Sequence, residues 1–166
     1  MKIGIDARLM HETGVGRYIR ALISNLSEID RVHEFIVFIR SLNDLPVLTD
    51  NWQAVLVDIQ WHTLQEQLEM PKIYDQAKLD LLHIPYFSVP IFTHTPFIVT
   101  IHDLTISHFS TGKATTLPLP LYLLKRLGYA WVLKNAVTNS KAVITVSNTV
   151  REQLIEDYRL DPKKYL

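Results

Sequence analysis

A short apolar strand, a glycine-containing loop and an amphipathic helix follow one another at the N-terminus, and this order constrains the fold more than any other feature. Residues 2–6 form an apolar run that ends in an acid, and the polar segment 7–16 follows it directly. The next apolar residues recur with a helical period, at positions 15, 18, 19, 22, 23 and 26. A strand, a loop and a helix in this order open a βαβ unit, so we expect an α/β fold.

The rest of the chain extends this pattern. Further apolar strands are predicted at residues 34–39, 54–57, 79–84, 97–101 and 142–146. Helices are predicted at 63–78, in two pieces because of Pro71, and at 121–137, which is apolar nearly all round and should pack on more than one side. Residues 147–149 can cap a last helix, in which Thr149 and Glu152 have capping-box spacing. Val150, Leu154 and Tyr158 give this helix one apolar stripe. We therefore predict a Rossmann-like, doubly wound, mainly parallel sheet of six or seven strands with helices on both faces.

The amino-acid composition excludes several classes of protein. The chain has 166 residues, of which 48% are apolar and 20% charged, so it can build one sizeable core and is not disordered. It has no cysteine, which excludes a disulfide framework and a thiol nucleophile and fits a cytoplasmic location. The N-terminus lacks the long apolar core of a signal peptide. Residues 81–101 carry no charge, but Pro85, Pro90 and Pro96 interrupt them, so two strands are expected there and not a membrane span.

Charge is balanced in total but not along the chain. Lysine plus arginine and aspartate plus glutamate each number 17, so no global field attracts nucleic acid, and we expect no nucleic-acid partner. Residues 104–151, however, carry six basic side chains and no acidic one. Two interpretations stay open: a patch that meets an anionic partner, or a solvated helix face.

Polar residues at the carboxyl ends of the strands are the first candidates for a site, because ligands of open parallel sheets bind there. Four segments qualify and could share one cleft: the loop with Gly14 and Gly16, residues 83–86, His102 with Asp103, and Ser147. Two glycines at a helix start favour an anion such as a diphosphate, although they equally suit a tight turn. His102 is either a ligand-facing imidazole or a structural histidine bonded to backbone.

Several site types are disfavoured. A dinucleotide fingerprint requires a third glycine where Ile19 stands and an acid where Arg40 ends the second strand. No phosphate-binding Gly-x-x-x-x-Gly-Lys-Ser/Thr run exists. Four histidines fall within 26 residues, but their spacings match no usual ligand pattern, so we expect no metal. They are His83, His94, His102 and His108.

Three segments together resemble a known family. The opening IGIDARLMHETGVGRYIRALISNL, the central PFIVTIHDLTISHF and the closing AVITVSNTVREQLIEDYRLDPKKY are similar, in order and spacing, to the N-terminal domain of GT-B glycosyltransferases of family 4. The resemblance implies one half of a GT-B fold. It also implies retaining transfer of a sugar from a nucleotide diphosphate sugar to a saccharide or lipid-linked saccharide acceptor, with no metal or other cofactor.

Site residues follow from this resemblance. It implies catalytic roles for His102, which matches the histidine near the reacting carbon of the donor sugar, and for its neighbour Asp103. Substrate-binding roles are implied for Gly14 and Gly16 of the glycine loop and for Ser147 and Asn148 of the serine-containing turn. Arg17 beside the glycines and Tyr86 after the fourth strand are added as substrate-binding candidates because of their positions.

The resemblance also implies a domain organisation. Residues 1–166 are expected to be a single acceptor-side domain, whose partner is a C-terminal nucleotide-sugar-binding domain absent from this chain, so that the isolated domain is inactive. The basic stretch 104–151 is compatible with peripheral contact at the inner face of a membrane. The alternative function is a non-catalytic Rossmann-like module that binds a phosphorylated ligand. A second α/β domain encoded after residue 166 would favour the enzyme over this module.

Overall fold

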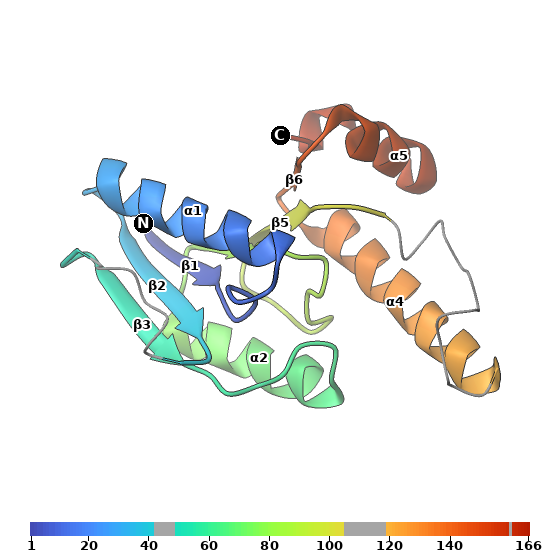
Figure 1. Ribbon diagram of the computed structural model, residues 1–166, viewed down its shortest axis with the longest axis horizontal. Helices are drawn as coiled ribbons and strands as arrows, with labels where there is room; N and C mark the ends of the chain where they lie inside the picture. The colour runs from blue at the N-terminus through green and yellow to red at the C-terminus, as the bar shows by residue number, and fades with distance from the viewer. Residues whose placement is uncertain (42–48, 105–118, 160) are drawn as a thin grey trace.

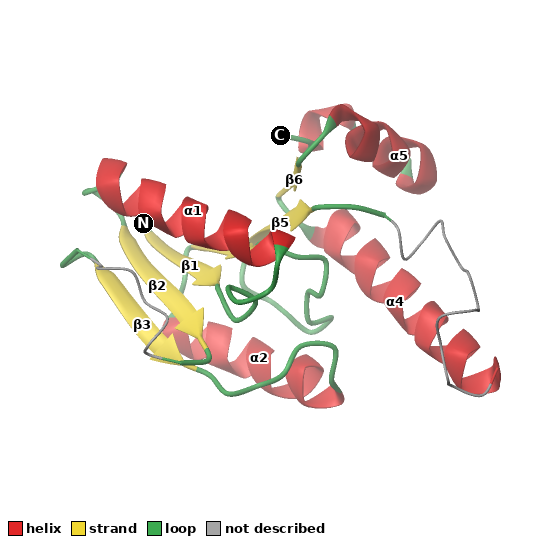
Figure 2. Cartoon of the chain, in the orientation of Figure 1, coloured by secondary structure: helices red, strands yellow, loops and turns green. Residues whose placement is uncertain are grey.

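The computed structural model describes residues 1–41, 49–104, 119–159 and 161–166. Within these residues six strands form one parallel sheet in the order β3-β2-β1-β4-β5-β6 (Figure 2). The strands are β1 (Lys2–Asp6), β2 (Glu34–Ile39), β3 (Trp52–Leu56), β4 (Leu81–Ile84), β5 (Phe97–Ile101) and β6 (Ala142–Thr145). The strand order reverses between β1 and β4, as in a doubly wound sheet. The predicted Rossmann-like α/β fold is confirmed.

Helices cover both faces of the sheet. Helix α1 (Gly14–Ile29) lies on one side and α2 (Leu64–Ala77) on the other (Figure 1). Helix α4 (Leu119–Asn139) connects β5 to β6, and α5 (Asn148–Tyr158) and a short 3₁₀ helix, Pro162–Lys164, complete the chain. On one face of the sheet, Ile19 and Ile23 of α1 pack against strands β1 to β3. On the other face, residues of α2 and of the C-terminal end of α4 pack against the sheet.

Helix α2 is one continuous helix and not the two pieces predicted. Pro71 lies inside it and is buried. A proline in a helix removes one hydrogen bond and usually bends or breaks the helix. Here the same face also buries Met70 and Tyr74, both 0% exposed, against the sheet. We attribute the continuity of the helix to this burial.

Helix α4 was predicted to pack on more than one side, but its burial is concentrated in its C-terminal part. Its C-terminal part is buried at Leu133, Ala136 and Val137. In the preceding turns four large apolar side chains are 47–69% exposed: Leu123, Leu124, Leu127 and Trp131. Figure 1 shows why, since the N-terminal end of α4 extends away from the sheet. No helix in the described part of the chain is both long enough and apolar enough to span a membrane.

Ser147 caps α5, as predicted, but the capping box at Thr149 and Glu152 is wrong. The Ser147 hydroxyl accepts a hydrogen bond from the Val150 backbone N–H at 3.3 Å, so the helix begins at Asn148. Thr149 is therefore already inside the first turn. The predicted apolar stripe is present, because Val150 and Leu154 are buried and Tyr158 packs beside them.

The two glycines at the start of α1 have different structural roles. A Cβ at Gly16 would lie 2.5 Å from the Met10 carbonyl oxygen, whereas one at Gly14 would meet no atom within 4 Å. Neither glycine has a positive φ. Gly16 is thus needed for the close approach of the preceding loop, and Gly14 is not.

We predict that Gly16→Ala lowers the free energy of unfolding by about 1–3 kcal/mol, as overpacking does. The matched control Gly14→Ala should change it by less than about 1 kcal/mol, the range of helix propensity. Urea unfolding followed by circular dichroism measures both. Equal losses in the two variants would contradict the close-approach role of Gly16.

Candidate functional site

A cavity lies at the carboxyl edge of the sheet, between segments that are far apart in the sequence. Its volume is about 330 Å³, within the size range of small-molecule sites. The loop before α1 and the connection between β3 and α2 form part of the wall, and the residues after β4 and β5 form the rest. The lining residues are Leu9, Glu12, Thr13, Gly14, Val15, Trp61, His62, Tyr86, His102 and Asp103. We call this space the cleft.

The cleft brings together four of the residues predicted from the sequence: Gly14, Tyr86, His102 and Asp103. Tyr86, His102 and Asp103 also line an adjoining cavity beside α4, where Arg126 contributes a cation. Burial, with smaller contributions from Asp103, Tyr129 and Glu12, raises the pKa of Tyr86 to about 12. Its hydroxyl is therefore protonated at neutral pH and can donate a hydrogen bond.

The other four predicted residues line neither of these cavities. Gly16 is buried beneath the Met10 carbonyl, and Arg17 is exposed. Ser147 follows β6 at the same edge of the sheet, but its hydroxyl accepts the bond that caps α5. Asn148 is the first residue of that helix and is exposed. Substrate contact by these four residues stays a prediction.

His102 is bonded to backbone and also lines the cleft, so its ligand-facing role stays a prediction. Its Nε2 lies 3.0 Å from the Pro85 carbonyl oxygen, and Nε2 carries the hydrogen because a carbonyl can only accept. Burial lowers the pKa of His102, against smaller opposing effects of the Pro85 bond and of Asp103. The ring is thus neutral at pH 7, and its Nδ1 is a hydrogen-bond acceptor.

A polar chain behind His102 fixes the back of the cleft. The Tyr18 hydroxyl lies 3.1 Å from the Thr100 hydroxyl, which lies 2.8 Å from Nε2 of His83. The Tyr18 ring also packs edge-on against His102 at 5.1 Å between centroids. Burial and the nearby His102 lower the pKa of His83 to about 4. His83 is therefore a neutral, buried residue of the scaffold and lines neither cavity.

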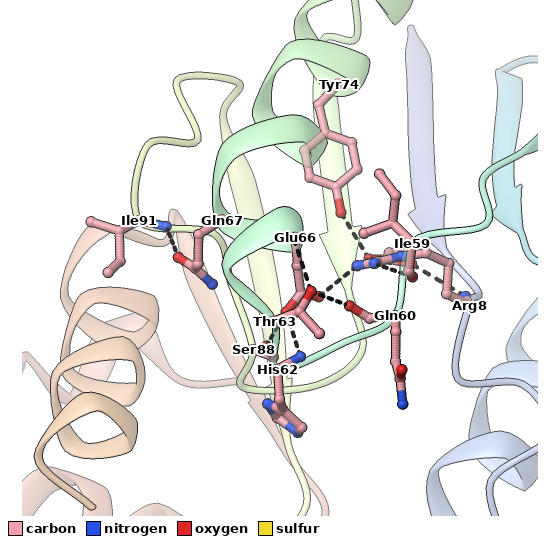
Figure 3. A network of polar contacts seen from close by, with 11 residues as sticks. Arg8, Ile59, Gln60, His62, Thr63, Glu66, Gln67, Tyr74, Ser88 and Ile91 are labelled. Carbon is pink, nitrogen blue, oxygen red and sulfur yellow. Dashed lines mark hydrogen bonds and ion pairs between the residues drawn. The ribbon is translucent and has the colours of Figure 1, made fainter. Parts of the chain in front are cut away.

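A buried ionic network joins segments that form the wall of the cleft (Figure 3). Arg8 contacts Asp6 through Nη2 at 2.7 Å and Glu66 through the same nitrogen at 2.8 Å. Its Nη1 donates to the Ile59 carbonyl at 3.1 Å, and the Tyr74 hydroxyl donates to Asp6 at 2.8 Å. Burial raises the pKa of Asp6, but the charge and hydrogen bonds of Arg8 outweigh it, so the pKa is lowered overall.

Glu66 connects three segments of the chain. Besides the ion pair with Arg8, one of its carboxylate oxygens accepts from the Ser88 hydroxyl at 2.9 Å and from the His62 backbone N–H at 2.8 Å. Thr63 caps α2 by accepting from the Glu66 N–H at 3.1 Å. The carboxylate thus ties the end of β1, the start of α2 and the loop after β4 to one another.

Sequence reasoning missed this network and the aromatic wall beside it. His62 packs on Phe87, with 5.4 Å between centroids, and meets the edges of Tyr86 and Tyr129. Two signals were available: an arginine two residues after the acid that ends β1, and the Thr63-x-x-Glu66 spacing of a capping box. Among the described residues, no group of three or more histidine, aspartate or glutamate side chains is placed to hold a metal ion.

Comparison with known proteins assigns the family. Residues 13–165 match the model of Glycosyltransferase Family 4. The chain belongs to this family, as its motifs predicted.

Similarity to solved structures and to curated proteins is low. Among solved structures, a crystal structure of the Bordetella bronchiseptica enzyme WbmH in complex with NAD+ matches with a TM-score of 0.43 and 10% sequence identity. The match covers 94% of this chain and 62% of that one, so this chain spans less than two thirds of that enzyme's length. No curated protein matches the sequence at a significant level.

We predict that Glu66→Ala lowers the free energy of unfolding by about 3–5 kcal/mol, because it leaves the buried Arg8 without one of its two anions. The matched control Ser88→Ala removes only one hydrogen bond to the same carboxylate and should cost about 1 kcal/mol. Urea unfolding of both variants is the measurement. Similar small losses would show that Arg8 and Asp6 form a sufficient pair without Glu66.

Proposed function

We propose that this chain is the N-terminal, acceptor-side domain of a retaining glycosyltransferase. The donor is a nucleotide diphosphate sugar, and the acceptor is a saccharide or a lipid-linked saccharide. The observation that carries the proposal is the family match over residues 13–165 together with a cleft that gathers Gly14, Tyr86, His102 and Asp103. A C-terminal domain supplies most contacts to the nucleotide, and no metal or other cofactor takes part.

The start of α1 suits the diphosphate of the donor. The Thr13 side chain makes no capping hydrogen bond, and Gly14 is exposed in the cleft. The first backbone N–H groups of the helix and its dipole therefore favour an anion at this point. When the bond between the sugar and the diphosphate breaks, negative charge grows on the departing oxygen, and fixed donors stabilise it.

His102 and Asp103 are assigned to the reacting sugar. Because Nε2 of His102 is bonded to Pro85, the neutral ring offers Nδ1 as an acceptor for a sugar hydroxyl. The bond to Pro85 fixes the ring before substrate arrives, which is the preorganisation that favours the transition state. Tyr86 adds a hydroxyl donor from the neighbouring strand end.

A direct assay tests the proposal. The complete enzyme is incubated with UDP- and GDP-hexoses as donors and p-nitrophenyl hexosides as acceptors, and products are identified by mass spectrometry and anomeric NMR. Transfer with retention of configuration supports the proposal. Binding of the nucleotide without transfer to any acceptor would favour the alternative, a non-catalytic module for a phosphorylated ligand.

We predict that His102→Ala in the complete enzyme lowers kcat roughly 10²- to 10³-fold, as loss of other preorganised polar groups does. The free energy of unfolding should fall by only about 1 kcal/mol, for the lost bond to Pro85. Steady-state kinetics and urea melts on one preparation separate these effects. An unchanged kcat with a clearly lowered unfolding midpoint would assign His102 to the scaffold alone.

We further propose that the exposed half of α4 contacts an anionic membrane surface and keeps the enzyme at the cytoplasmic face. Leu124, Leu127 and Trp131 recur at helical spacing and are 61–69% exposed. Lys125 and Arg126 lie among them, and residues 104–151 contain no acid. Apolar side chains flanked by cations are the composition of a helix that lies on anionic lipid. Of the basic residues in this stretch, Lys113 lies outside the described residues.

We predict that the double variant Leu124→Ser/Leu127→Ser binds phosphatidylglycerol vesicles at least about tenfold more weakly than the native chain, a change of about 1.4 kcal/mol. The matched control is Leu56→Ser, which removes a leucine 57% exposed on β3. Vesicle sedimentation reports binding, with phosphatidylcholine vesicles as the uncharged comparison. Equal binding by both variants would remove α4 from the contact.

A further inference from the structure

His62 has a backbone conformation that its position does not explain. Its φ is 60°, and only Lys78 and Arg159 share a positive φ among the described non-glycine residues. Those two residues are the C-caps of α2 and α5, where the left-handed conformation is common. His62 instead precedes the N-cap of α2, so no helix end accounts for it. Strained residues of this kind persist where the surroundings fix them and are frequent at functional sites.

The surroundings do fix His62. Its backbone N–H donates to Glu66 at 2.8 Å, and this carboxylate is held in turn by Arg8 and Ser88 (Figure 3). The imidazole lies on Phe87, nearly parallel at 29°. The buried Glu66 carboxylate therefore fixes the backbone conformation of His62, and stacking on Phe87 fixes the orientation of its ring.

His62 borders two open spaces at the surface of the protein. His62 is exposed and lines the cleft with Gly14 and His102. It also lines, with Tyr129, a groove between α2 and α4 that contains neither Gly14 nor His102. His62 is thus a lining residue that the cleft and this groove share, away from the two residues assigned to the diphosphate and the reacting sugar. With the donor placed at Gly14 and His102, as proposed above, the space beside His62 is left for the acceptor.

The chemistry of the ring suits a sugar hydroxyl. Among the described residues, no hydrogen bond reaches its ring nitrogens. Partial burial, with the positive charges of Lys125 and Arg8 nearby, lowers the pKa of His62, so the ring is neutral at pH 7. A neutral imidazole has one donor and one acceptor nitrogen, so it can accept from a sugar hydroxyl or donate to it. The neighbouring Trp61 and Tyr86 supply aromatic surface of the kind on which a sugar ring packs.

We propose that His62 is an acceptor-binding residue, which hydrogen bonds to a hydroxyl of the acceptor sugar, and that Glu66 is its positioning residue. This inference rests on the proposed function and deepens it, since it assigns the acceptor to the wall formed by the connection between β3 and α2. The buried network thereby has a functional consequence: it holds a strained residue in place against the cleft.

The test uses the complete enzyme with the donor and the p-nitrophenyl hexoside that give transfer in the assay above. His62→Phe keeps the stacked ring and removes both nitrogens, so the KM for the acceptor should rise at least about tenfold, while the KM for the donor changes less than about threefold. His94→Phe is the control, because the His94 side chain is 82% exposed and lines neither the cleft nor the groove.

A second measurement avoids dependence on the folding of a variant. Imidazole ¹⁵N signals of the native enzyme are recorded, and the His62 signal is assigned with His62→Asn, since asparagine tolerates a positive φ. The acceptor should shift the His62 signal, and the donor alone should not. If the native enzyme transfers sugar but the acceptor KM of His62→Phe and the His62 signal are both unchanged, the assignment of His62 is wrong. If the native enzyme transfers no sugar to any acceptor, the proposed function fails, and this inference fails with it.

Discussion

The carboxylate of Glu66, held by the guanidinium of Arg8, is the interaction on which the cleft depends. The two side chains are 1% and 3% exposed, and removing such charges from water costs several kcal/mol each before any contact is made. The cost is offset because each group is surrounded: Arg8 by Asp6, Glu66 and the Ile59 carbonyl, and Glu66 by Ser88 and the His62 N–H. A buried pair of this kind adds little net stability compared with apolar packing. We infer that its contribution is to fix the relative positions of three loops.

Those loops all leave the same edge of the sheet. In a parallel sheet every strand presents its carboxyl end on one side, so the residues that follow β1, β3 and β4 meet there, together with those that follow β5. The network lies beneath this edge and the polar chain of Tyr18, Thr100 and His83 behind it. The cleft is consequently lined by side chains whose supports are hydrogen-bonded to one another. Such a site is preorganised, as the transfer proposed above would require.

His102 lines the cleft and is also bonded to backbone. One ring nitrogen donates to the Pro85 carbonyl after β4, and the other is an acceptor. The bond to backbone therefore does not exclude a contact with a ligand, which stays a prediction. The sequence does not show that the two ring nitrogens, which point in different directions, can have different partners.

The sequence by itself determined the sheet, because the periods of strands and helices are local properties of each segment. The six strands, the capping by Ser147 and the family motifs could all be identified from the sequence. It also indicated Gly14, Tyr86, His102 and Asp103 as candidate site residues, since residues that follow buried strands reach the same edge of the sheet.

Only the tertiary structure decided the features that depend on long-range contacts. Pro71 is tolerated because its neighbours are buried, Leu124 and Trp131 stay exposed because α4 extends beyond the sheet, and Gly16 is needed because the Met10 carbonyl lies against it. The roles of Arg8, Glu66 and His62 also depend on long-range contact. Arg8 and Glu66 are 58 residues apart, and the local sequence does not predict that they pair.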